Sequence, residues 1–284
     1  MKRMSRAAAA KKEAAKGTAS RLLAIPEAES LAGKKEIRAL DFGYGDGIMT
    51  IGIAEAIVRL LGPERLNLLA VNSERSNGGS EIMEFMLGES FVELTYAEPY
   101  TAYFPHDLSK VMLMCGVAAF DVISLFNPSP PESLMRPIME SNRVLMANEF
   151  GIDVRAALAM AGYLGRSRSE AEYLSEITGL LDRNYGFVVE GGPDLVELKR
   201  LAKRVALQRT IEIFPLVLSQ EGILIVACDD LVPHSEVGQI LGRAGFDIVM
   251  SGPNEPADVW SPSGLANYNK HLFAAVKKQG KKIE

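Results

Sequence analysis

The sequence contains few of the residues that bind structural metals or build disulfide frameworks. Only two cysteines and three scattered histidines occur among its 284 residues. Because there is no Cys-x-x-Cys pair and no cluster of histidine and cysteine, we expect no metal site. Cys115 and Cys228 each lie inside an apolar segment. Buried thiols in a reducing compartment are the state that we expect for both.

Long apolar runs are also missing. No stretch of about 18 consecutive apolar residues occurs, so the sequence predicts no transmembrane helix and no membrane partner. The amino-terminal stretch MKRMSRAAAAKKEAAKG is basic, but its apolar part is only four alanines long. A secretory signal has a longer and more apolar middle. We therefore expect a cytoplasmic protein.

Positive charge is scarce beyond the first residues. Residues 1–16 hold six Lys or Arg and one Glu, a net charge of +5. The whole chain carries −5, so the remaining residues carry −10 once this +5 is taken away. An acidic body is a poor electrostatic footprint for nucleic acid and favours a small-molecule substrate. We interpret residues 1–34 as a basic, solvated and partly flexible arm, which leaves phosphate contacts through the arm open.

Strand-like and helix-like segments alternate from residue 36 onward. This alternation is typical of a parallel sheet with crossover helices on both faces. Apolar runs rich in β-formers predict strands at 36–42, 66–72, 91–97, 120–126, 221–230, 246–252 and 270–278. Helical periodicity predicts helices that include 48–62, 80–89 and 235–245.

The middle of the chain changes character, because residues 131–192 show mostly helical periodicity. We therefore predict a sheet domain made of residues 35–130 and 193–284. The residues between these two parts are interpreted as a helical insertion, or cap, after the fourth strand. A further helix at 194–213 is assigned to the sheet domain.

A glycine-rich loop, GYGDG, joins the first expected strand to the first expected helix. Its glycines are Gly43, Gly45 and Gly47. Glycine adopts positive φ and lets a ligand approach the backbone closely, and the first amides of a helix carry partial positive charge. In open α/β sheets, ligands bind beyond the carboxyl ends of the strands. The loop is therefore the candidate ligand site.

Two phosphate-binding patterns do not fit this loop. The pattern G-x-G-x-x-G needs a third glycine where Ile48 or Thr50 stands, and G-x-x-x-x-G-K-[ST] has no match in the loop. Asp41, two residues before the first glycine, would repel a pyrophosphate. A ligand that carries an ammonium group suits this carboxylate better.

The pattern that does fit is D-x-G-x-G-x-G, which resembles motif I of the class I S-adenosylmethionine-dependent methyltransferases. The resemblance implies a Rossmann-like, doubly wound α/β fold with a mostly parallel seven-stranded sheet and an antiparallel last strand. It covers roughly residues 35–130 and 215–278. It also implies S-adenosylmethionine as the cofactor and methyl transfer as the activity.

The resemblance assigns further residues to the cofactor. In this family an acid at the end of the second strand usually holds the ribose, and here Asn72 and Glu74 stand there, with Asn72 preferred by register. An acid after the third strand often lies near the adenine, and Asp107 occupies that place, although it also fits a helix cap. The implied cofactor-binding residues are Asp41, Gly43, Tyr44, Gly45, Gly47, Asn72, Glu74 and Asp107.

The acceptor is not identified by any motif. Asn127 begins a segment that partly resembles the Asn-Pro-Pro-aromatic loop of amino-group methyltransferases. The segment departs from that loop because Pro130 stands where the aromatic residue is expected. Asn127 is the one catalytic candidate. GYGDG also resembles the aminopropyltransferase loop, although Phe126 replaces the catalytic acid of that group. Aminopropyl or aminocarboxypropyl transfer and a non-catalytic RNA-associated module stay open, as do the acceptor atom and the oligomeric state.

Overall fold

The computed structural model describes residues 5–43, 47–71, 81–97, 120–126, 169–192, 194–229, 231–253 and 270–278, together with Pro137 and Glu140. The chain divides into two compact units. One comprises Met1–Pro128 and Thr210–Glu284, and the other comprises Ser129–Arg209. The second unit holds most of helix α7 (Leu195–Ile211), which the sequence had assigned to the sheet domain.

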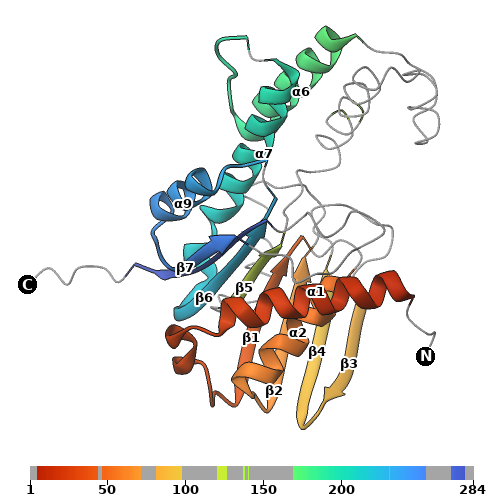
Figure 1. The fold of residues 1–284 in the computed structure, drawn as a ribbon, viewed down its shortest axis with the longest axis vertical. Helices are drawn as coiled ribbons and strands as arrows, with labels where there is room; N and C mark the ends of the chain where they lie inside the picture. Colours follow the sequence, from red (N-terminus) through yellow and green to blue (C-terminus); the bar gives the residue numbers. More distant parts are fainter. Residues whose placement is uncertain are drawn as a thin grey trace, which may run out of the picture. The chain divides into compact units, whose positions relative to one another are not determined.

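The first unit is built on one eight-stranded sheet with the order β3-β4-β2-β1-β5-β6-β8-β7 (Figure 1). Strands β1, β2, β4, β5 and β6 run parallel, β3 is antiparallel to β4, and β8 is antiparallel to both β6 and β7. The predicted α/β fold with a mostly parallel sheet and an antiparallel last strand is confirmed. The strands are β1 (Glu36–Phe42), β2 (Arg65–Val71), β3 (Glu81–Leu87), β4 (Ser90–Ala97), β5 (Phe120–Phe126), β6 (Leu218–Cys228), β7 (Phe246–Pro253) and β8 (His271–Lys277).

The prediction of a helix over 80–89 is wrong, and the sheet therefore has one strand more than expected. Residues 81–89 form β3 and a two-residue turn, Gly88–Glu89, that leads into β4. Gly88 adopts φ 62°, which suits the tight turn of a hairpin. The apolar residues Ile82, Phe85 and Met86 fit a helical spacing, and the segment EIMEFML does not alternate between apolar and polar residues as a half-buried strand does. Pairing with β4 makes it a strand in spite of this spacing.

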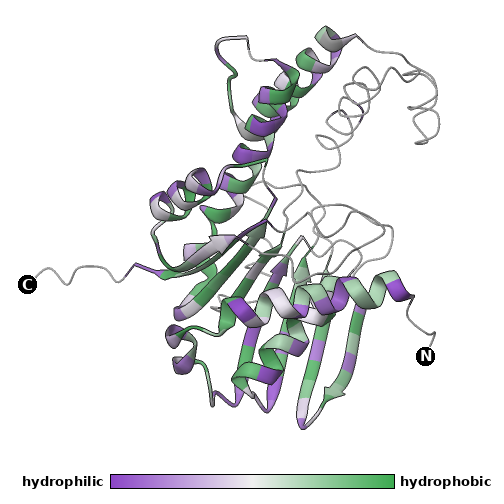
Figure 2. Ribbon diagram, in the orientation of Figure 1, coloured by the Kyte–Doolittle hydropathy of each residue, from purple (hydrophilic) through white to green (hydrophobic). Residues whose placement is uncertain are grey.

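Helices α1 (Arg6–Leu23) and α2 (Ile48–Leu61) lie side by side over one face of the sheet (Figure 1). Alternate residues of a strand point to opposite faces, and Ile37 and Ala39 of β1 join the core on the helix side. Figure 2 shows the apolar strands beneath these two helices. The buried residues of α1 are Ala15, Thr18, Ala19, Leu22 and Leu23.

The expectation of a solvated arm is therefore wrong for residues 6–23. The small side chains of α1 allow a close approach to α2 at Gly52, where an added Cβ would lie 2.3 Å from the backbone oxygen of Lys12. Lys12 and Lys16 of α1 also bind Glu55 of α2, with Nζ–Oε distances of 2.7 and 2.9 Å. Burial opposes the ionisation of Glu55, but hydrogen bonds and charges from the two lysines outweigh it and lower the pKa of Glu55.

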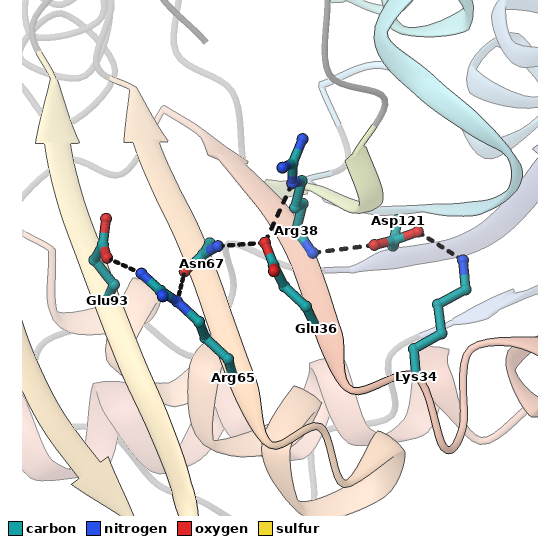
Figure 3. A network of polar contacts seen from close by, with 7 residues as sticks. All are labelled: Lys34, Glu36, Arg38, Arg65, Asn67, Glu93 and Asp121. Atoms are coloured by element: carbon teal, nitrogen blue, oxygen red, sulfur yellow. Dashed lines mark hydrogen bonds and ion pairs between the residues drawn. The ribbon is translucent and has the colours of Figure 1, made fainter. Parts of the chain in front are cut away.

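The amino ends of the strands carry a network of charged side chains (Figure 3). Arg65 of β2 donates to Glu93 of β4 at 2.5 Å and to Asn67 at 2.8 Å, and Asn67 donates to Glu36 of β1 at 2.7 Å. On β5, Asp121 accepts from Lys34 Nζ at 2.9 Å and from the backbone N–H of Arg38 at 3.0 Å. These charges are engaged with one another, and they lie at the opposite end of the strands from the glycine loop.

Of the remaining described helices, α6 (Glu170–Tyr185) belongs to the second unit, and α8 (Phe214–Val217), α9 (His234–Arg243) and the 3-10 helix η1 (Pro26–Ser30) belong to the first. In the second unit, α6 begins with a capping box, in which the Ser169 hydroxyl accepts from the N–H of Glu172 and the Glu172 carboxylate accepts from the N–H of Ser169. In the first unit, α8 and α9 flank β6, and η1 precedes β1. Among the described residues, no helix combines the length and the apolar composition needed to cross a membrane.

Candidate functional site

The order of the strands reverses at the end of β1, where the glycine loop begins. From β1 the chain continues through α2 to β2 on one side, while β5 pairs with β1 on the other side. Asp41 of β1 lies directly opposite Ser124 of β5. Ligands of open α/β sheets bind outside the carboxyl ends of the strands at such a reversal. The topology therefore supports the site that the glycine pattern predicts.

Asp41 is buried under the start of α2 and is only 2% exposed. Thr50, in the first turn of α2, donates its hydroxyl to Asp41 Oδ2 at 2.5 Å, and Ser124 donates its hydroxyl to Asp41 Oδ1 at 2.7 Å. One carboxylate thus joins β1, α2 and β5. In the sequence Thr50 had only argued against a dinucleotide fingerprint, and Ser124 carried no signal because 83 positions separate it from Asp41.

Burial raises the pKa of Asp41, and the hydrogen bonds from Thr50 and Ser124 offset only part of that rise. The native state therefore holds the Asp41 proton to a higher pH than the unfolded chain does. A group of this kind stabilises the protein less as the pH rises above the pKa of the unfolded chain, near 3.8. The ionised carboxylate is thus kept at a cost in folding free energy.

We predict that Asp41→Asn changes the pH dependence of stability. The neutral amide cannot ionise, so the free energy of unfolding of the variant should gain on that of the wild type as the pH rises from about 4 toward neutrality. Chemical denaturation of both proteins across this range measures the difference. The matched control is Asp247→Asn, because Asp247 is exposed to solvent. Parallel stability curves for Asp41→Asn and the wild type would contradict the prediction.

Gly43 and Gly47, the two described glycines of the loop, stand at its two ends. The N–H of Gly43 donates to the carbonyl of Val71 at 2.7 Å, which continues the pairing of β1 with β2. No described atom lies within 4 Å of where a Gly43 side chain would begin. Gly47 caps α2 with φ 75° and offers no side chain to the first amides, and the first turn of α2 contains no acid. The start of α2 therefore presents partial positive charge toward the loop.

Tyr96 is a residue of this site that sequence reasoning missed. It is joined to Asp41 by register, since Asp41 pairs with Ala70 and Ala70 pairs with Tyr96. Its ring reaches the loop, and a Cβ on Gly47 would lie 2.9 Å from Tyr96 Cε1. Tyr96 therefore limits where the start of α2 can lie. Only the register across three strands, which the sequence does not specify, could have shown this contact.

The structure describes three of the predicted site residues, namely Asp41, Gly43 and Gly47, and it brings them together at one strand end. The other candidates lie outside the described residues, and their roles stay predictions. They are Tyr44, Gly45, Asn72, Glu74, Asp107 and the catalytic candidate Asn127. Within the described ranges, no group of three or more His, Cys, Asp or Glu side chains is arranged to hold a metal ion.

No protein-family model and no curated protein matches the sequence. Similar folds include MnmC2 from Aquifex aeolicus, with 13% identity and a TM-score of 0.37 over 90% of this chain and 58% of that chain. A candidate SAM-dependent methyltransferase from Streptococcus mutans has 10% identity and a TM-score of 0.40 over 92% and 48%. SMU.776, a candidate methyltransferase complexed with SAH, has 12% identity and a TM-score of 0.37 over 87% and 46%.

This chain spans about half the length of these three solved chains. Because the likeness is distant, the fold assignment rests on the order and direction of the strands. The site is defined by its own geometry, which consists of a buried carboxylate, two hydroxyl donors and a helix start without a side-chain cap.

Proposed function

We propose that this protein binds S-adenosylmethionine at the carboxyl end of β1 and transfers its methyl group to a small-molecule acceptor. The observation that carries the proposal is the placement of Asp41. The carboxylate lies at the strand-order reversal, directly under the start of α2, and is held by Thr50 and Ser124. This arrangement couples a ligand loop to the two central strands of the sheet.

The residues at this place fit the amino-acid end of the cofactor. Its carboxylate would lie near the first amides of α2, whose first turn contains no acid. Its ammonium group would lie near the loop glycines, where the negative charge of Asp41 acts from below. Direct contact between Asp41 and the ammonium group stays a prediction, because both carboxylate oxygens accept hydroxyl hydrogens in this structure. No described atom lies beside the α-carbon of Gly43 where a side chain would begin, which suits a ligand that approaches the backbone.

S-adenosylmethionine, when bound, supplies a methyl group that is activated by a sulfonium. The share of the protein in such a reaction is to align an acceptor with that group, which is a matter of proximity and orientation. The rigid junction of β1, α2 and β5 at Asp41 supports this role. Asn127 follows β5 directly in the sequence and stays the candidate for contact with the acceptor.

Two observations favour a small acceptor over a nucleic acid. Residues 17–284 carry a net charge of −10. In addition, Lys12 and Lys16 are two of the six basic residues within 1–16, and both bind Glu55. Two of the positive charges of residues 1–16 are thus engaged within the protein, which leaves fewer of them for contacts with phosphate.

The first test is a calorimetric titration with S-adenosylhomocysteine, for which we expect saturable binding at one site per chain. Adenosine diphosphate serves as the matched nucleotide control, and it should not bind because Asp41 repels its pyrophosphate. An absence of heat with S-adenosylhomocysteine would overturn the proposal.

The type of group transfer is tested with labelled S-adenosylmethionine and a small-molecule extract. We expect S-adenosylhomocysteine as the by-product of methyl transfer. If methylthioadenosine accumulates instead, the protein transfers the aminocarboxypropyl group of S-adenosylmethionine, and the methyl-transfer part of the proposal is wrong. Aminopropyl transfer would give methylthioadenosine only from the decarboxylated form of this donor, which is therefore assayed in parallel.

A further inference from the structure

Among the strands that the structure describes, β3 forms one end of the sheet, and none of them pairs with its outer edge. Leu87 and Ser90 flank the two-residue turn of the β3–β4 hairpin and are directly opposite each other. In a hairpin of this type the flanking pair exchanges both backbone hydrogen bonds, and bonded pairs then alternate along the ladder. The N–H and C=O groups of Ile82, Glu84 and Met86 therefore point away from β4.

The side chains of this edge are unusually apolar for exposed residues. Nine large apolar side chains are exposed among the described residues, and β3 alone supplies three of them. Ile82 is 62% exposed and Met86 is 58% exposed on one face of the strand, while Met83 is 36% exposed on the other. An exposed apolar edge strand is a template for pairing with another strand. Apolar residues stand on both sides of Glu84 in this strand, so another apolar strand would suit it as a partner.

We propose that β3 pairs antiparallel with β3 of a second copy of this chain, about a two-fold axis at Glu84. This register places Ile82 opposite the partner's Met86 and Met86 opposite the partner's Ile82. On the other face it places Met83 opposite the partner's Phe85. In this register Ile82, Glu84 and Met86, whose backbone groups point away from β4, lie opposite the same three residues of the partner strand. The two strands can therefore exchange backbone hydrogen bonds at these positions while their apolar side chains face one another. The proposal does not depend on the proposed methyl transfer.

Glu84 is the single unfavourable position in this register, because it meets the partner's Glu84. Directly opposed like charges destabilise a strand pair. Glu93 lies opposite Glu84 on β4, but it is engaged by Arg65 at 2.5 Å and so adds less repulsion. The paired state is therefore a weak dimer whose strength Glu84 sets. Charged edge residues limit unwanted association in natural sheets in the same way.

Sedimentation equilibrium of the full chain tests the charge effect. We expect concentration-dependent dimerisation, and Glu84→Gln should tighten it by about two- to fivefold. Ile82→Lys should abolish it, because a charge would replace an exposed apolar contact at both ends of the paired strands. If Glu84→Gln leaves the association unchanged or weaker, or if no dimer forms in this variant up to its solubility limit, the proposal is wrong.

Cysteine cross-linking tests the register itself. In a bonded antiparallel pair the two Cα atoms at the axis lie about 5.5 Å apart, so Glu84→Cys should give a covalent dimer with a short bis-maleimide. Glu81→Cys is the matched control, because Glu81 is also exposed on the same strand but would lie about 20 Å from its symmetry mate. Cross-linking at position 84 and not at 81 supports the proposal. Cross-linking at both positions, or at neither, overturns it.

Discussion

Replacing Gly52 with alanine is expected to destabilise the protein by about 3 kcal/mol. The added Cβ would lie 2.3 Å from the oxygen of Lys12 and 3.0 Å from the backbone nitrogen of Lys16. Both atoms belong to the backbone of α1, so no side-chain rotation can relieve the clash. Helix α1 must move away from α2, which would strain the ion pairs of Glu55 and loosen the packing of Ala15 and Ala19.

The same substitution at Gly17 is the matched control for this prediction. Gly17 lies within α1 and is exposed, and no described atom beyond its own stretch of helix lies within 4 Å of where its Cβ would be. Alanine should therefore stabilise α1 by about 0.5–1 kcal/mol, since glycine is a poor residue for a helix interior. Chemical denaturation of both variants measures the two effects. Equal effects of the two substitutions would show that α1 does not pack on α2 as described.

Replacing Asp41 with alanine is expected to weaken the binding of S-adenosylhomocysteine by about 10- to 100-fold, which corresponds to about 1.4–2.8 kcal/mol. The change removes the charge under the loop. It also removes the carboxylate that accepts from both Thr50 and Ser124, so the start of α2 loses its connection to β5. Titration calorimetry on the folded variant measures the loss of affinity.

The matched control is Asp121→Ala, which removes a second buried acid of the same sheet. Asp121 accepts from Lys34 and from the backbone of Arg38 at the amino ends of the strands. Its loss should lower the free energy of unfolding by about 1–3 kcal/mol, as expected for a buried hydrogen-bonding group, and leave the affinity for S-adenosylhomocysteine unchanged. If both variants bind equally well, Asp41 is a structural residue only. If neither binds, the loss reflects folding rather than the site.

The residues at the centre of the sheet were predictable because their patterns are local. β1 and β5 are short apolar runs that end at a loop, and they form strands where the sequence predicts them. Helix α2 ends at Leu61, and Gly62, which the sequence marks as the residue that closes the helix, adopts φ 61° as the cap. The strand at 81–87 was not predictable in this way. Its apolar residues have a helical spacing, and only its pairing with β4 makes it a strand.

The functional site shows the same division. Asp41 and its glycines form a contiguous pattern whose charge and spacing already argue for a ligand with an ammonium group. Thr50, Ser124 and Tyr96 are ordinary residues in the sequence. They join the site because α2 starts above Asp41 and because β5 and β4 align with β1 in a particular register.

The sequence by itself thus determined the α/β class and the position of most core elements, and it predicted the loop on which a ligand would lie. The tertiary structure decided where α1 packs, which hydroxyls hold Asp41, and which strand lies at the edge of the sheet. The physical reason is the range of the interactions. Periodicity and turn chemistry act between neighbours in the sequence, and they can be recognised in it directly. A helix contact at Gly52 or a hydrogen bond from Ser124 depends on segments that meet only after the whole sheet has formed.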